Sequence, residues 1–245
     1  MPFLDEMNFD VILQAGQSNS EGYGLGPVDK EYRPCDDIYY LCNDFTVAIA
    51  DYYNKREMPA ANLALSFARR YVDDGRLKQS RKLLIIRAAV GGTGFSDNRW
   101  KPKDDLCIIM HQLIKYALNM GGDNRLVGFI WHQGETDSIL NADYDTHYKN
   151  LSTLLEGVRG KYGAGLPFIA GDFVHEWKNK NLDICRPVVD AMKAVCAGNK
   201  AAFIETDGLS SNNMALGNED DIHFSRQALH KLGERYYKAF CDIAD

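Results

Sequence analysis

Nearly continuous hydrophobic runs alternate along this chain with segments whose apolar residues recur every three or four positions. The continuous runs are typical of strands buried on both faces of a parallel sheet. They predict strands at Asp10–Ala15, Ile38–Cys42, Lys82–Ala89, Leu126–Trp131, Pro167–Gly171 and Ala202–Glu205. The periodic segments predict helices at Ala60–Asp73, Asp104–Met120, Ala142–Tyr162, Leu182–Ala197 and Ser225–Ile243. This strand–turn–helix rhythm predicts an α/β fold, with helices on both faces of a parallel sheet.

Signals at the helix ends agree with this division. Gly75, the pair Gly121-Gly122 and Gly163 stand just beyond predicted helices, where glycine commonly ends a helix. Ser225 is a suitable N-cap for the last helix. The sequence has no repeat, no low-complexity tract and no linker rich in proline or serine. We therefore expect residues 1–245 to form a single domain.

Composition and charge narrow the classes of partner. The net charge of −6, with no basic stripe, argues against binding to nucleic acid or to an anionic membrane. No run approaches the ~18 apolar residues of a membrane span. The first residues, Met1–Glu6, lack the basic and apolar regions of a secretory signal, which predicts a cytoplasmic protein unless a signal was removed. The six cysteines show no Cys-x-x-Cys pair and no zinc-like spacing, so we expect no metal site. Without an export signal we expect free thiols and not disulfides, and we expect no cofactor.

Polar, glycine-rich segments follow the predicted strands. They are Gly16–Asn19, Val90–Gly94 and His132–Asp137, and a further polar segment, Asp220–His223, precedes the last helix. In open parallel sheets, ligands bind beyond the carboxyl ends of the strands. We therefore expect these segments to meet at one rim and to form the functional site.

Two of these segments carry the residue types of nucleophilic catalysis. Ser18 follows a strand and a glycine, and His223 has a carboxylate at Asp220 and another at Asp221. A serine hydroxyl needs a base to take its proton, and the base needs an anion to orient it. The sequence thus predicts nucleophilic acyl transfer, with the choice between the two carboxylates left open by their spacing. Because Ser20 stands where a Gly-x-Ser-x-Gly elbow has glycine, the pattern disfavours an α/β-hydrolase.

The other segments offer groups that stabilise negative charge. Acyl transfer places charge on a carbonyl oxygen, which needs fixed hydrogen-bond donors. The backbone N–H groups of Gly91-Gly92 and the side-chain amide of Gln133 are suitable donors. Glu135 and Asp137 have the chemistry of metal ligands or of an acid–base pair. We favour the interpretation that they brace the loop by hydrogen bonds.

Taken together, these residues resemble the SGNH hydrolases, and within them the carbohydrate-esterase branch that includes acetylxylan esterases and sialate O-acetylesterases. The matching segments occur in the family's order and span nearly the whole chain. They are Gly16-Gln17-Ser18-Asn19, Gly91-Gly92-Thr93 with Trp100 after it, Trp131-His132-Gln133-Gly134-Glu135-Thr136-Asp137, and Asp220-x-x-His223-Phe224-Ser225.

The resemblance implies a flavodoxin-like, three-layer α/β/α sandwich around a parallel sheet of about five strands. It implies Ser18 as nucleophile, His223 as base and Asp220 as the group that orients the base. It also implies an oxyanion hole made by the Ser18 and Gly92 N–H groups and the Gln133 side chain. The implied activity is that of a serine esterase that removes O-acetyl groups from a carbohydrate, such as acetylxylan or an O-acetylated sialic acid, without a metal or cofactor.

Residues next to these motifs are candidates for the substrate pocket. We assign this role to Gln17, Asn19, Trp100 and Glu135. One departure from the family's pattern lies beside the nucleophile. The family usually continues Gly-Gln-Ser-Asn with methionine, a small residue and glycine, whereas Ser20-Glu21-Gly22 follows here. We expect Ser20 and Glu21 to reshape the pocket and to affect which sugar is accepted.

Two alternative functions stay open. An SGNH lipase or thioesterase would act on longer acyl chains and would need a long apolar pocket. A catalytically inactive relative would keep the fold and bind carbohydrate without turnover. The predicted triad favours an enzyme, and the sequence does not indicate an oligomeric state.

Overall fold

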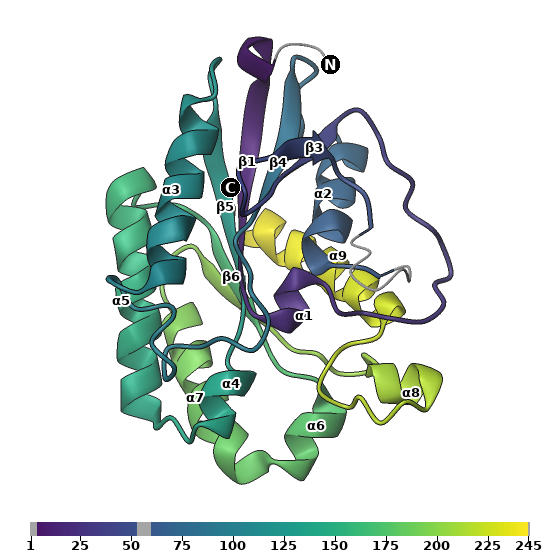
Figure 1. Ribbon diagram of the computed structural model, residues 1–245, viewed down its shortest axis with the longest axis vertical. Helices are drawn as coiled ribbons and strands as arrows, with labels where there is room; N and C mark the ends of the chain where they lie inside the picture. Colours follow the sequence, from purple (N-terminus) through teal and green to yellow (C-terminus); the bar gives the residue numbers. More distant parts are fainter. Residues whose placement is uncertain (1–3, 53–59, 245) are drawn as a thin grey trace.

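A central β-sheet runs through the molecule (Figure 1). The computed structural model describes residues 4–52 and 60–244. Within them the sheet has seven strands in the order β3-β2-β4-β1-β5-β6-β7. The strands are β1 (Asn8–Gly16), β2 (Ile38–Leu41), β3 (Val47–Ile49), β4 (Arg81–Arg87), β5 (Arg125–His132), β6 (Phe168–Gly171) and β7 (Ala201–Ile204).

The predicted strands are all present, but the expected count of about five is wrong. All neighbouring pairs are parallel except β2 and β3, which pair antiparallel. The sequence analysis missed β3 because Val47–Ile49 is a three-residue edge strand with two exposed positions. It therefore lacks the buried apolar run by which the other strands were recognised.

The long predicted helices are confirmed, with small changes at their ends. Among the described residues the helices are α1 (Ser18–Glu21), α2 (Leu63–Asp73), α3 (Asp105–Asn119), α4 (Glu135–Ile139), α5 (Tyr144–Tyr162), α6 (His175–Lys180), α7 (Leu182–Cys196), α8 (Asn212–Leu216) and α9 (Arg226–Ala244), with a 3-10 turn at Leu4–Glu6. The short helices α1, α4, α6 and α8 carry too few turns to show a hydrophobic period in the sequence.

Caps fix the helix starts. α2 begins at Leu63, three residues later than predicted, because the Asn62 side chain accepts a hydrogen bond from the Leu65 N–H at 2.9 Å. Ser225 acts as predicted at α9, where its hydroxyl accepts from the Ala228 N–H at 3.1 Å.

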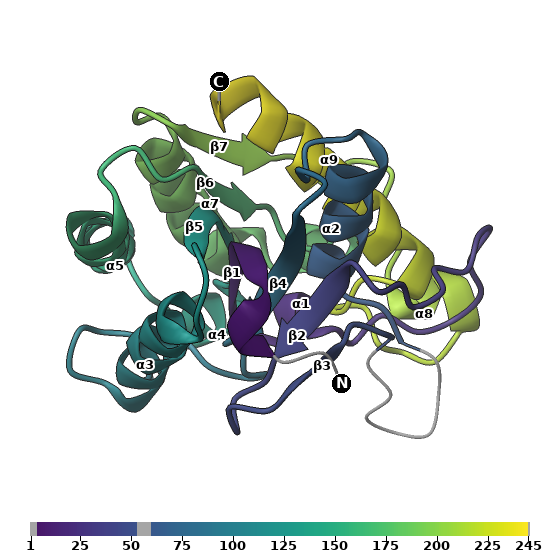
Figure 2. The ribbon, with the colours of Figure 1, turned by 90° about the horizontal axis from the view of Figure 1, so that it is seen from above.

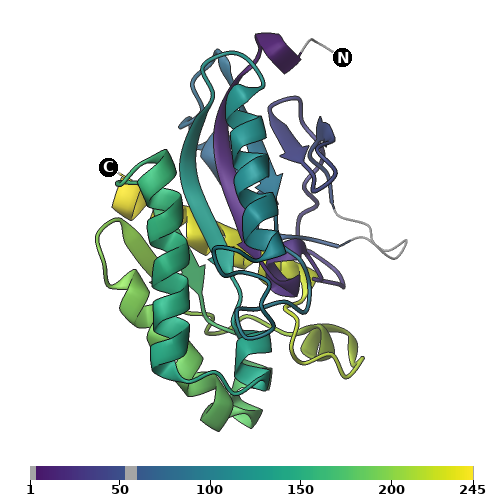
Figure 3. The same ribbon diagram turned by 60° about the vertical axis from the view of Figure 1, so that its left-hand side comes forward.

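Helices cover both faces of the sheet, which confirms the three-layer α/β/α architecture (Figures 2 and 3). Along β1, Leu13 packs into the core beneath α3, α5 and α7, whereas Ile12 packs into the core beneath α2 and α9. This alternation is the period of two expected of a strand buried on both sides.

The order of strands places β1 at the centre of the sheet, between β4 and β5. From β1 the chain passes to β2 and the edge strand β3 and returns to β4, between β2 and β1. It then crosses to the other side of β1 and continues outward through β5, β6 and β7. Such a reversal of strand order opens a crevice at the carboxyl ends of the central strands. Within the described ranges, no helix has the length and apolar character needed to cross a membrane.

Candidate active site

A tight turn after β1 places Ser18 at the start of α1. At Gly16, φ is 127° and an added Cβ would lie 2.1 Å from the carbonyl oxygen of His132, so glycine is required. The Gln17 N–H donates to that same oxygen at 3.0 Å and ties the turn to β5. Ser18 is the first residue of α1, so its backbone N–H has no acceptor within the helix. The turn therefore presents both a hydroxyl and an N–H at the sheet's carboxyl edge.

Ser18, His223 and Asp220 form one hydrogen-bonded chain. His223 Nε2 lies 2.9 Å from Ser18 Oγ, and His223 Nδ1 lies 2.8 Å from Asp220 Oδ1. Because a carboxylate only accepts, we assign the proton to Nδ1, which leaves Nε2 to accept from the serine hydroxyl. Asp221 instead pairs with Lys180 at 2.8 Å. The structure thus distinguishes the two carboxylates that the spacing left open.

A buried asparagine completes the surroundings of Asp220. Asn212 Nδ2 donates to Asp220 Oδ2 at 2.9 Å. Burial alone would raise the pKa of Asp220, but the hydrogen bonds from His223 and Asn212 outweigh it and lower the pKa below its ordinary value. The carboxylate therefore stays ionised at neutral pH. The sequence analysis missed Asn212, because its position depends on an isolated bridge between Ser211 and Phe224 that no spacing reveals.

Asn19 holds the two halves of the site together. Its Oδ1 accepts from the Phe224 N–H at 3.0 Å, and its Nδ2 donates to the Ile222 carbonyl at 3.0 Å. These bonds fasten the residues on both sides of His223 to the helix that carries the nucleophile. The Tyr23 ring stacks on the His223 ring with 5.1 Å between centroids. The imidazole is therefore held in place by its backbone and by its ring face.

The Gly91-Gly92 loop lies beside the nucleophile. A Cβ added at Gly91 would lie 3.5 Å from the Ser18 Cβ. The Gly91 N–H is already occupied, because it donates to Glu21 Oε2 at 2.7 Å. Gly92 has a φ of 71°, and nothing lies within 4 Å of its Cβ position. The Cβ position of Gly92 therefore faces open space, and its role as an oxyanion donor stays a prediction.

Gln133 lies buried next to the residue that precedes the nucleophile. Its Nε2 donates to Asp137 Oδ2 at 2.7 Å and makes a longer, 3.4 Å contact with Gln17 Oε1. Asp137 also accepts from the N–H groups of Phe95 at 3.1 Å and Ser96 at 2.6 Å. The expectation that Asp137 braces the loop is therefore confirmed. Its fixed carboxylate sets the orientation of the Gln133 amide.

The four substrate-pocket candidates do not line an open pocket. Gln17 is 3 % exposed, and Asn19, Trp100 and Glu135 are each 0 % exposed. Trp100 donates its indole N–H to Thr93 Oγ1 at 3.0 Å inside the core. Each of these side chains makes a hydrogen bond below the surface, so its role in the substrate pocket stays a prediction. They support the segments that carry Ser18, Gly92 and Gln133.

Glu135 is the least satisfied of these buried groups. Its Oε1 accepts from Asn19 Nδ2 at 2.7 Å, whereas Oε2 has no partner among the residues that the structure describes. Burial raises its pKa, against the opposing effect of the Asn19 hydrogen bond. The alternative role of Glu135 as a metal ligand gains no support. The described part of the chain has no group of three or more His, Cys, Asp or Glu side chains suited to a metal.

The chain matches a known protein family over most of its length. The family model described as "carbohydrate esterase, sialic acid-specific acetylesterase" matches residues 8–242. The chain belongs to this family. It is therefore a carboxylic ester hydrolase of the carbohydrate acetylesterase type, which confirms the resemblance drawn from the motifs. No curated protein sequence matches the chain.

Solved structures share the fold of this carbohydrate esterase. The crystal structure of NanS superimposes with a TM-score of 0.77 at 18% identity, covering 96% of this chain and 97% of that chain. A protein from Arabidopsis thaliana gives 0.72 at 19% identity, covering 96% and 98%. A carbohydrate acetylesterase from Xanthomonas citri gives 0.64 at 15% identity, covering 96% of this chain and 56% of that chain. At these identities the likeness concerns the fold.

Proposed function

We propose that the protein is a serine esterase that removes O-acetyl groups from a carbohydrate through an acyl-enzyme on Ser18. The observation that carries this proposal is the hydrogen-bonded chain from Ser18 through His223 to Asp220, which lies beside the Gly91-Gly92 loop. It supplies a nucleophile, a base and an anion in the order that acyl transfer needs.

In the first half-reaction the Ser18 oxygen attacks the ester carbonyl carbon. The hydroxyl proton passes to His223 Nε2, 2.9 Å away, and the carbonyl electron pair moves onto oxygen. The Ser18 and Gly92 N–H groups and the Gln133 amide donate to that oxyanion. As the tetrahedral intermediate collapses, the bond to the sugar oxygen breaks, and His223 protonates the departing alcohol.

In the second half-reaction water attacks the acetyl group on Ser18. His223 Nε2 takes the water's proton, and a second tetrahedral intermediate forms in the same oxyanion hole. Its collapse releases acetate and returns the proton to Ser18. Throughout, the ionised Asp220 stabilises the imidazolium and keeps Nδ1 protonated. No step requires a metal or cofactor.

Several findings support an acetylated carbohydrate as the substrate. The family description names sialic acid-specific acetylesterases, and the Xanthomonas citri structure that shares the fold is called a carbohydrate acetylesterase. The surroundings of the nucleophile are crowded with polar atoms. A side chain atom placed at Gly91 Cβ would lie 3.2 Å from Glu21 Oε2 and 3.2 Å from the Tyr23 hydroxyl. Such a site suits a small acyl group better than a long apolar one.

Replacing the nucleophile tests the proposal. Ser18→Ala should abolish hydrolysis of acetylated sugars and of p-nitrophenyl acetate, with an unchanged circular dichroism spectrum and thermal midpoint within a few degrees of wild type. Ser210→Ala, which removes a hydroxyl bonded to Ser225 at 2.8 Å, is a matched control and should retain activity. A Ser18→Ala protein that keeps kcat within about tenfold of wild type contradicts the proposal.

A further inference from the structure

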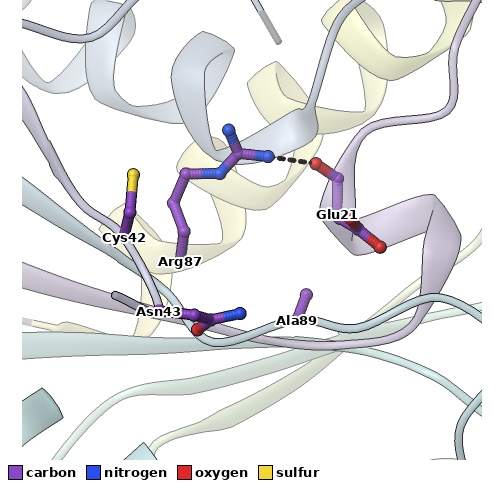
Figure 4. A pocket seen from close by; sticks show the side chains of 5 residues that line it. All are labelled: Glu21, Cys42, Asn43, Arg87 and Ala89. Atoms are coloured by element: carbon purple, nitrogen blue, oxygen red, sulfur yellow. Dashed lines mark hydrogen bonds between the residues drawn. The ribbon is translucent and has the colours of Figure 1, made fainter. Parts of the chain in front are cut away.

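A small cavity lies close to the Gly91-Gly92 loop and has no role in the acyl-transfer steps (Figure 4). It measures about 120 Å³ and is lined by Glu21, Cys42, Asn43, Arg87 and Ala89. Since a water molecule occupies about 30 Å³ in the liquid, the cavity has room for a few polar groups of a ligand. Its lining comes from α1, from β4 and the loop after it, and from the residues that follow β2.

Glu21 joins this cavity to the reaction centre. It stands three residues after the nucleophile, and its carboxylate accepts from the Gly91 N–H at 2.7 Å. Ala89, another residue of the lining, stands two positions before Gly91 in the sequence. A Cβ at Gly91 would in turn lie 3.5 Å from the Ser18 Cβ. Glu21 and the Gly91-Gly92 loop therefore connect the cavity to the nucleophile.

Arg87 is held in a defined position within the cavity. Its Nη2 donates to the Glu21 carbonyl oxygen, and its guanidinium lies over the Tyr40 ring at 4.8 Å. Figure 4 shows Arg87 extended toward Glu21, with Asn43 and Ala89 beside the pair and Cys42 on the other side of Arg87. Such a stacked guanidinium is pre-organised and loses little freedom when it binds a ligand.

The chemistry of these side chains indicates what they would recognise. Arginine only donates hydrogen bonds, an ionised glutamate only accepts them, and asparagine does both. Neighbouring hydroxyl groups of a sugar also donate and accept, so each finds a complement in Arg87, Glu21 and Asn43. A carboxylate would only accept, and it would face the negative charge of Glu21.

We propose that this cavity is a subsite that binds the hydroxyl groups of the sugar from which the acetyl group is removed. This inference rests on the proposed function and deepens it, because it assigns the alcohol side of the ester to Arg87, Glu21 and Asn43. Glu21 is then a specificity residue that also positions the Gly91-Gly92 loop. It occupies the part of the nucleophile motif in which this chain departs from the family's usual sequence.

The test compares two esters that share the acetyl group and differ in the alcohol. The ratio of kcat/KM for an O-acetylated neutral xyloside to kcat/KM for p-nitrophenyl acetate isolates binding of the sugar. In Arg87→Met this ratio should fall by about tenfold or more, as expected for the loss of a charged hydrogen-bond donor. Arg70→Met, which removes an arginine in the last turn of α2 that pairs with Asp74, is the matched control and should leave the ratio unchanged.

A second variant guards against a folding defect, because Arg87 also contacts the Glu21 backbone. Asn43 is exposed, and Asn43→Ala should lower the same ratio severalfold with an unchanged thermal midpoint. If both variants are active and their ratios equal that of the wild type, the sugar subsite is overturned while the proposed esterase function stands. A loss confined to O-acetylated sialic acid, with the neutral sugar unaffected, means that the cavity binds a carboxylate, and also overturns it. A wild type that hydrolyses neither ester removes the proposed function as well.

Discussion

Gln133→Ala separates a structural role of this glutamine from a catalytic one. In the free enzyme, Gln133 Nε2 gives one hydrogen to Asp137 Oδ2 at 2.7 Å. Its other hydrogen has only the 3.4 Å contact with Gln17 Oε1, which already accepts from the Thr136 N–H at 3.1 Å. That weak contact is the one an oxyanion would replace.

The structure gives a magnitude for each role. Removing the amide deprives Asp137 of one of three donors, which should lower the free energy of unfolding by roughly 1.5–3 kcal/mol. For a chain of this size, each kilocalorie lowers the thermal midpoint by about 2–4 °C. If Gln133 donates to the oxyanion, its loss should also cost about 2.7–4 kcal/mol of transition-state stabilisation, or about 10²–10³ in kcat.

The assay measures kcat, KM and the thermal midpoint on the same purified variant, well below its midpoint. We expect kcat to fall as stated, with KM little changed, because the contact strengthens only as charge develops on the carbonyl oxygen. Gln112→Ala, on the exposed surface of α3, is the matched control and should alter neither quantity. A Gln133→Ala protein with a lowered midpoint but near-normal kcat would refute the oxyanion role and leave only the brace to Asp137.

Further predictions concern the carboxylates and the acyl group. Asp220→Asn should lower kcat far more than Asp221→Asn, because only Asp220 contacts His223, and the reverse order in parallel assays would exchange their roles. Because the pKa of Asp220 is lowered in the native state, ionised Asp220 stabilises the fold above the ordinary value of 3.8, and this stabilisation is lost as pH falls through the lower native pKa. Asp220→Asn should therefore flatten only the most acidic part of the curve of thermal midpoint against pH. The raised pKa of Glu135 has the opposite effect, because the stability of the fold falls as pH rises above 4.5 and the buried carboxyl group ionises. Glu135→Gln should therefore raise the thermal midpoint at pH 8 but not at pH 4. An equal change at both pH values would contradict the argument from burial. Acetate esters should be hydrolysed faster than butyrate or octanoate esters, because a site that excludes a methylene forfeits the ~0.8 kcal/mol of its burial; a rising series would instead favour a lipase-like enzyme. Dialysis against a chelator should leave kcat unchanged, and a loss that zinc restores would contradict the metal-free mechanism.

The sequence predicted those features that depend on local patterns. Buried runs such as Leu126–Trp131 marked the strands of the sheet, and the period of Ala142–Tyr162 marked a helix on its surface. The motif segments were correctly placed at the carboxyl edge, because parallel strands connected through helices all end there. Ser18 and His223 were correctly expected to lie close together for the same reason.

The features that were missed depend on contacts between distant segments. The spacing alone did not distinguish Asp220 from Asp221, and the resemblance alone favoured Asp220, because tertiary contacts decide which carboxylate faces His223. Asn212 reaches Asp220 across a loop that no periodicity describes. The candidate pocket residues Trp100 and Glu135 were assigned by proximity to motifs, whereas their burial follows from packing against β5 and Asn19.

The most direct test of the account is to identify the residue that carries the acetyl group during turnover. The enzyme is mixed with p-nitrophenyl acetate, quenched in acid within the first turnover and digested, and the mass of each peptide is measured. The account predicts the mass of one acetyl group on the peptide that contains Ser18, and its absence from the same peptide of the Ser18→Ala variant. Release of nitrophenol without an adduct, or an adduct on any other residue, would contradict the acyl-enzyme on Ser18.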